Sequence, residues 1–158
     1  MAKLLIYTLQ MGSLRKFIFG RDSFMKNQYA SDMLNYLYEE GDRDLIFFGQ
    51  ILGVVSYDEN DNLFSKTSER RFNDAIKLVN YLISLGDFDI GRTLKQKDGT
   101  YINVIYNNGL SEFLLNANEL FSKNGIDDMD LNSGIWLKKL HIGQSKSRIP
   151  NKITELFG

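Results

Sequence analysis

The sequence predicts an α+β fold: a helix-rich N-terminal half followed by a small, mainly antiparallel sheet packed against helices. Two observations carry this prediction. Apolar residues recur every three or four positions through most of residues 1–85, which is the spacing of amphipathic helices. From Phe88 onward they alternate with polar residues, and Asp98-Gly99 then predicts a hairpin turn, because glycine accepts a positive φ.

The first expected element is a helix over residues 3–19, with a strand at Lys3–Leu9 as the alternative. Its apolar positions are Leu4, Tyr7, Met11, Leu14 and Ile18. A second helix is expected to be capped by Asp22 or Ser23 and ended by Gly41. Its apolar positions are Met25, Tyr29, Met33, Tyr36 and Leu37.

Asp42 is expected to cap a third helix that ends near Ser56. Its apolar face consists of Leu45, Phe48, Ile51, Leu52 and Val55. A fourth helix is expected between a cap at Thr67 or Ser68 and a stop at Gly86. One side of this helix is expected to be buried, and it consists of Phe72, Ala75, Ile76, Val79, Leu82 and Ile83.

The first long strand is expected to start near Phe88, and the return strand of the hairpin to cover residues 100–106. The expected buried face of the first strand consists of Phe88, Ile90 and Leu94, and its expected solvent-exposed face consists of Asp87, Asp89 and Thr93. A further helix is expected to end at Gly125, with apolar positions Leu110, Phe113, Leu114, Ala117, Leu120 and Phe121. The last elements are a strand at Ile135-Trp136-Leu137, with Trp136 in the core, and a short terminal helix that has Pro150 in its first turn and contains Ile153, Leu156 and Phe157.

Length and composition indicate one ordinary globular domain over residues 1–158, with 43% apolar and 25% charged residues. No apolar run approaches the roughly 20 residues of a membrane-spanning helix. The apolar run in residues 1–7 is too short for a signal peptide, so a cytoplasmic protein is expected.

The charge is unevenly distributed. Residues 137–158 contain five basic and one acidic side chain, against 14 basic and 19 acidic ones in residues 1–136. The basic tail begins near residue 141. Five cations, Lys138, Lys139, Lys146, Arg148 and Lys152, could contact phosphate, with a solvated strand end and tail as the alternative. The acidic body argues against nucleic-acid binding and suits a basic protein partner.

Three acidic groups are candidates for docking such a partner. They are the turn containing Glu39, Glu40, Asp42 and Asp44, the strand face of Asp87 and Asp89, and a loop containing Asp127, Asp128 and Asp130. Each could instead be a solvated surface. Asp87 and Asp89 could also hold Mg²⁺ or act as an acid–base pair.

Residues 58–69 resemble a calcium loop in spacing, with Asp58, Asn60 and Asn62 followed by Glu69. However, Leu63 stands where the sharp-turn glycine is needed, so a solvated loop is the preferred interpretation. No metal or other cofactor is expected.

No catalytic signature is present. The chain has no cysteine, which removes thiolate nucleophiles and cysteine-ligated metals. His141 is its single histidine, so Ser-His-Asp chemistry could only be centred there. We therefore expect a protein that is not an enzyme.

The segment from Phe72 to Lys139 resembles bacterial immunity proteins of contact-dependent growth inhibition and related polymorphic toxin systems. The resembling features are the helix ending in Leu82-Ile83-Ser84-Leu85-Gly86-Asp87-Phe88, the Ile90-Gly91 and Asp98-Gly99 hairpin, the helix around Glu112–Phe121, and the strand Gly134-Ile135-Trp136-Leu137. The resemblance implies a cytoplasmic, non-catalytic protein that binds the C-terminal domain of one cognate toxin, often a nuclease, and covers its active site. The alternatives are an adaptor or nucleic-acid-binding module, or a metal-dependent hydrolase using Asp87 and Asp89.

Overall fold

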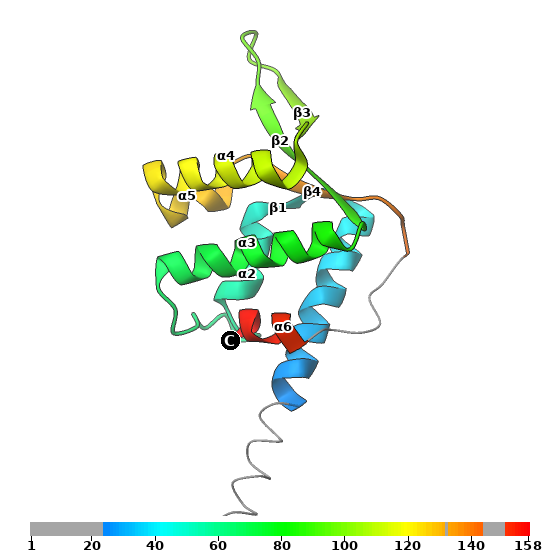
Figure 1. Cartoon of the computed structure of the whole chain (residues 1–158), viewed down its shortest axis with the longest axis vertical. Coiled ribbons are helices and arrows are strands. Elements are labelled where there is room, and N and C mark those ends of the chain that lie inside the picture. The colour runs from blue at the N-terminus through cyan, green and yellow to red at the C-terminus, as the bar shows by residue number, and fades with distance from the viewer. Residues whose placement is uncertain (1–23, 132, 144–150) are drawn as a thin grey trace, which may run out of the picture.

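The computed structural model describes residues 24–131, 133–143 and 151–158 (Figure 1). The first predicted helix, with its alternative strand, lies outside these residues. After helix α1, over residues 24–43, the elements are β1 (Ile46–Phe47), α2 (Phe48–Ser56), α3 (Ser68–Ser84), β2 (Phe88–Lys95), β3 (Tyr101–Ile105), α4 (Gly109–Asn124), α5 (Ile126–Leu131), β4 (Ile135–Lys139), α6 (Asn151–Thr154) and the 3₁₀ helix η1 (Glu155–Phe157).

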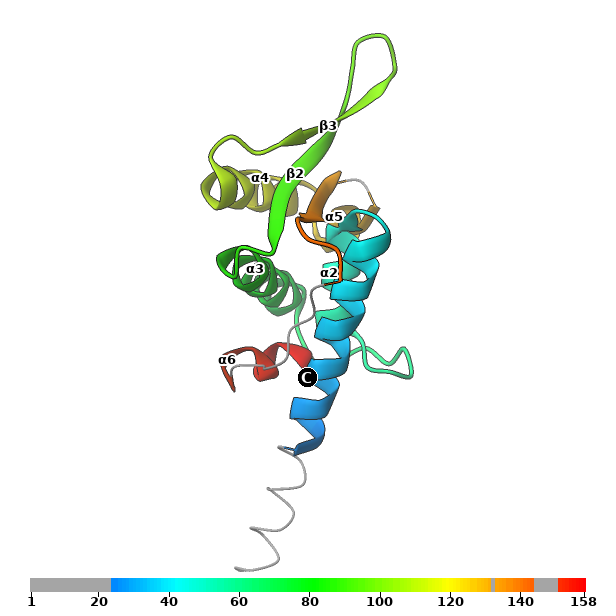
Figure 2. The same cartoon turned by 90° about the vertical axis from the view of Figure 1, so that its right-hand side faces the viewer.

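The fold is α+β, as predicted, and all strand pairings are antiparallel. The four strands have the order β1-β4-β2-β3, and the helices pack on the sheet around one core (Figures 1 and 2). In Figure 1 the hairpin of β2 and β3 rises beyond α4, while α6 packs at the opposite end of the molecule. No described helix is both long and apolar enough to cross a bilayer.

Helix α1 does not end at Gly41, so the predicted stop is wrong. The helix continues to residue 43. A Cβ at Gly41 would lie 3.1 Å from the Cβ of Lys139 and 3.2 Å from the Phe88 ring. Gly41 therefore allows α1 to lie close to the sheet. Asp42 consequently lies in the last turn of α1 and does not cap the next helix.

The third predicted helix starts later than expected, because a short strand precedes it. Ile46 and Phe47 pair with Leu137 and Trp136 as β1, and α2 then runs to Ser56 as predicted. The Phe47 amide donates to the side-chain oxygen of Gln50 at 2.8 Å, which satisfies one of the unpaired donors at the helix start.

Helix α3 begins and ends as predicted. The Thr67 hydroxyl accepts from the Arg70 amide at 3.2 Å, and Gly86 follows the helix with a φ of 76°. Most of the predicted apolar side is fully buried, whereas Ile76 and Ile83 are half-buried against the core.

The hairpin is confirmed at Asp98-Gly99, where Asp98 Oδ1 accepts from the Thr100 amide at 2.9 Å and Gly99 has a φ of 88°. Phe88 and Ile90 are buried as predicted. Leu94 is 37% exposed, so its assignment to the core is wrong. The hairpin extends past the helices at its base (Figure 2), and Leu94 is the last residue but one of β2, close to the turn.

The C-terminal half contains one unpredicted helix. Residues 126–131, which include Asp127, Asp128 and Asp130, form α5 and not the expected acidic loop, and Met129 of α5 is fully buried. The helix ending at Gly125 and the strand containing Trp136 are confirmed, and Trp136 is buried. A short terminal helix is present as predicted, and its residues Ile153, Leu156 and Phe157 lie in the core.

Candidate protein-docking surface

The predicted acidic turn at the end of α1 is largely engaged within the fold. The Asp42 carboxylate accepts from Lys139 Nζ at 2.6 Å and from the Gly143 amide at 3.1 Å. These hydrogen bonds, from Lys139 first, lower the pKa of Asp42. Glu40 pairs with Arg43 at 2.9 Å. Asp44 accepts from the Leu45 amide, whereas Glu39 is exposed.

Lys139 is not a solvated strand end. Its side chain is 1% exposed, and its ammonium also donates to the Tyr38 carbonyl at 3.2 Å. The position was predicted as solvated or phosphate-contacting because of its basic neighbours. The neighbouring strand β2, which pairs with Lys139 at Phe88, and helix α1 instead enclose the side chain. Asp42 supplies the opposite charge that a buried ammonium requires.

Asp87 and Asp89 have different neighbours. The Asp87 carboxylate accepts from the Tyr38 hydroxyl at 2.5 Å, so it joins the start of the sheet to α1. Asp89 lies opposite Lys138 of β4.

The Tyr38–Asp87 contact predicts an alkaline loss of stability. Burial, followed by the hydrogen bond to Asp87, raises the pKa of Tyr38 above its ordinary value of 10.0. The folded state then keeps a proton that the unfolded chain loses, so this stabilisation is complete below pH 10 and disappears as the pH rises further. We expect Tyr38→Phe to be less stable than wild type by about 1 kcal/mol at neutral pH. This difference should shrink above about pH 10.

Thermal unfolding of both proteins across this pH range measures the difference. Tyr101→Phe is the matched control, because it removes a hydroxyl from a side chain that is 66% exposed. A stability difference between wild type and Tyr38→Phe that stays constant with pH would contradict the assignment.

The third predicted acidic group lies far from the first. In Figure 1, α5 lies at the left of the molecule and the end of α1 at the right. Asp127 is exposed and lines a hollow of about 180 Å³ with Tyr57 and Arg71, whereas Asp128 is half-buried. The three predicted groups therefore do not form one continuous docking surface.

The structure instead brings together a set of acidic and aromatic residues between α1, α2 and the loop after α2. Two open grooves of about 340 and 290 Å³ lie there and share Tyr29, Asp58 and Glu59 in their walls. We call them the tyrosine grooves. Their lining includes four carboxylates and one amine, namely Asp32, Asp58, Glu59, Asp61 and Lys26. Three tyrosines contribute aromatic walls, namely Tyr29, Tyr36 and Tyr57.

The loop over residues 58–62 has a shape set by Asp58. Its carboxylate accepts from the amides of Asn60 and Asn62 at 2.8 and 2.9 Å and from the Asn62 side chain at 3.2 Å. These bonds lower the pKa of Asp58, and those from Asn62 contribute most. Asp58 is thus used to build a turn, as the solvated-loop interpretation expects, and the turn presents Glu59 and Asp61 to solvent.

Tyr29 connects this loop to α1. Its hydroxyl donates to the Tyr57 carbonyl at 2.8 Å, and its ring packs edge-on against Phe64 and Phe157. The pKa of Tyr29 is raised by burial and then by the charges of Asp58 and Glu59. Asp58 and Glu59 are therefore close enough to Tyr29 for their charges to act on its hydroxyl.

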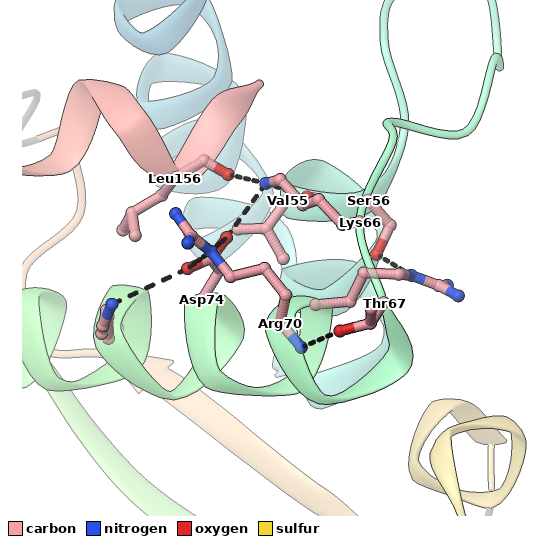
Figure 3. A network of polar contacts seen from close by, with 9 residues as sticks. Val55, Ser56, Lys66, Thr67, Arg70, Asp74 and Leu156 are labelled. Carbon is pink, nitrogen blue, oxygen red and sulfur yellow. Dashed lines mark hydrogen bonds and ion pairs between the residues drawn. The ribbon is translucent and has the colours of Figure 1, made fainter.

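A buried ionic cluster around Lys66 and Asp74 holds the segment that joins this loop to α3 (Figure 3). Lys66 Nζ donates to the carbonyls of Val55 at 2.8 Å and Leu156 at 2.7 Å, and lies 3.1 Å from Asp74. Arg70 adds a bond of 3.1 Å to each Asp74 oxygen. Desolvation lowers the pKa of Lys66. The cluster joins α2, α3 and η1, and Phe157 of η1 lines one of the tyrosine grooves.

Sequence reasoning did not identify the tyrosine grooves. Asp58 and Asn62 drew attention only as calcium ligands, and Tyr29 and Tyr36 only as core positions of a helix. Tyrosines and acidic residues are frequent in residues 29–36 and 57–61, and this could have pointed to the grooves. However, nothing in the sequence shows that these two segments meet. Among the described residues, no three His, Asp or Glu side chains converge as metal ligands.

The tyrosine grooves combine acidic groups with aromatic walls. Comparisons of the chain with protein families, with curated proteins and with solved structures found no match.

Proposed function

We propose that this protein is a cytoplasmic immunity protein that binds the C-terminal domain of a cognate toxin and covers its active site. The observation that carries the proposal is the pair of tyrosine grooves, where acidic side chains surround aromatic walls. The resemblance of residues 72–139 to immunity proteins of polymorphic toxin systems supports the same function. The hydrolase alternative gains no comparable support, because Asp87 is held by Tyr38.

The proposed partner is a nuclease domain, because a nuclease presents a basic surface to the phosphates of its substrate. Glu59 and Asp61 would lie against that surface, and their charges would accelerate association at low ionic strength. Tyr36 and Tyr57 are each about two-fifths exposed, at 39% and 40%, so they can anchor the contact while remaining packed at their bases.

The first test is protection of cells. The C-terminal domain of the toxin encoded next to this gene is expressed in cells with and without this protein. We expect growth only with the protein, and a stable complex on co-purification. Cells that die in both cases, and no complex, would exclude the proposed function.

The second test locates the interface. Glu59→Gln/Asp61→Asn removes two charges without touching the Asp58 bonds, and asparagine tolerates the φ of 60° at position 61. We expect this double variant to bind the toxin domain about tenfold to a hundredfold more weakly, mainly through slower association. Stopped-flow or biosensor kinetics at two ionic strengths measure the effect.

Glu69→Gln/Glu119→Gln is the matched control, since both residues are exposed acids away from the tyrosine grooves. Glu39→Gln tests the acidic turn at the end of α1. If Glu39→Gln weakens binding and Glu59→Gln/Asp61→Asn does not, the interface lies at the turn that the sequence predicted.

A further inference from the structure

We propose that the outer edge of β3 pairs with β3 of a second copy of this chain, so that the two sheets join into one antiparallel sheet across a two-fold axis. The proposal is independent of the proposed function, because the hairpin and the loop of the tyrosine grooves lie at opposite ends of the molecule in Figure 1.

Among the residues that the structure describes, β3 is an exposed edge strand. It has only β2 as a neighbour in the described sheet, and all five of its residues are exposed. Their sequence, Tyr-Ile-Asn-Val-Ile, carries no charge and no proline. Proteins that stay monomeric usually protect such an edge with charges, a proline or a bulge, because its free amides and carbonyls can pair with another strand. The opposite edge, β1, has only two residues.

The pattern of hydrogen bonds between β2 and β3 shows which backbone groups of β3 are free to pair with another strand. The Tyr106 amide donates to Ile90 and the Gln96 amide to Thr100, at 3.1 and 2.7 Å. In an antiparallel ladder the bonded residues alternate, so the even-numbered residues of β3 face β2. Tyr101, Asn103 and Ile105 therefore direct their amides and carbonyls away from the sheet.

These outward groups are symmetric about Asn103, which is why we assign the occupant as a second copy. In an antiparallel pair centred there, Asn103 meets Asn103 of the partner and Tyr101 meets the partner's Ile105. Each of these pairs can exchange two hydrogen bonds. On the other face, Ile102 meets the partner's Val104.

The chemistry of the side chains fits the same register. Aromatic and β-branched residues opposite one another are favourable cross-strand pairs, and no like charges meet because the strand is uncharged. A two-fold arrangement also closes, so it produces a dimer and not a fibre. An unrelated peptide could use the same backbone groups, but it would need no such symmetry.

The test places a charge on the proposed axis. Sedimentation or light scattering of the full chain, from micromolar to millimolar concentration, is expected to show twice the mass of 18.2 kDa for wild type. Asn103→Lys should raise the dissociation constant about a hundredfold, because two lysines meet at the axis. Asn103→Asp alone should weaken the dimer similarly. An equimolar mixture of the two variants should restore it.

Asn73→Lys is the control, since Asn73 is an exposed residue of α3. Circular dichroism confirms that each variant is folded. A monomeric wild type at millimolar concentration would overturn the proposal, and so would an Asn103→Lys variant that dimerises like wild type. A mixture that stays monomeric would overturn the assigned register.

Discussion

Replacing Asp74 by alanine is expected to lower the free energy of unfolding by about 3–5 kcal/mol. The Asp74 side chain is fully buried, and Lys66 beside it is 5% exposed. Without the carboxylate, the Lys66 ammonium stays enclosed and is partnered only by the Val55 and Leu156 carbonyls. Denaturant unfolding at neutral pH measures the loss.

Two further variants separate the burial of charge from the loss of packing. Lys66→Met should cost less, because Asp74 keeps Arg70 at 3.1 Å and both oxygens remain bonded. Lys66→Met/Asp74→Leu should recover most of the loss, because a buried ion pair replaced by apolar side chains is often close to neutral. An Asp74→Ala variant that unfolds at the same denaturant concentration as wild type would contradict the role of the cluster.

Gly91→Ala is expected to destabilise the protein by about 1–3 kcal/mol. A Cβ at Gly91 would lie 2.4 Å from Trp136 Cη2 and 2.4 Å from the Val104 carbonyl oxygen. The indole therefore lies across Gly91 from the neighbouring strand, and any side chain there must displace the ring or spread the strands. We expect a lower melting temperature together with a change in tryptophan fluorescence, since Trp136 is the single tryptophan.

Gly53→Ala is the matched control and should have the opposite sign. Gly53 lies within α2, and no atom lies within 4 Å of the position of its Cβ. Alanine should stabilise this helix by about 0.5–1 kcal/mol. If Gly53→Ala destabilised the protein as much as Gly91→Ala does, the loss at Gly91 could not be assigned to the contact with Trp136.

The predictions that were correct depend on chemistry within a few residues. Thr67 caps α3 because its hydroxyl reaches an amide three residues ahead, and Gly86 ends α3 because it accepts a positive φ. The Asp98-Gly99 turn pairs the two strands around it for the same local reason. Each of these signals is complete without knowledge of the rest of the chain.

The predictions that failed concern residues with partners distant in sequence. Glycine is typical of helix ends, yet α1 continues through Gly41, which packs against Lys139. Asp42 was expected to cap the next helix, yet it lies within α1 and binds Lys139. A carboxylate is the same in sequence whether it faces solvent or a buried cation, so its role cannot be read from neighbouring residues.

The candidate site shows the same division. The turn at Asp58 follows from its own side chain, but the tyrosine grooves depend on the hydrogen bond by which Tyr29 holds α1 to the loop after α2. Local sequence patterns were sufficient to predict the α+β class, helix α3 and the hairpin, because helix caps, turn residues and hydrophobic periodicity depend only on residues close together in the chain. Tertiary packing decided which acids are structural and which line a groove, because burial and charge pairing depend on residues far apart in the chain.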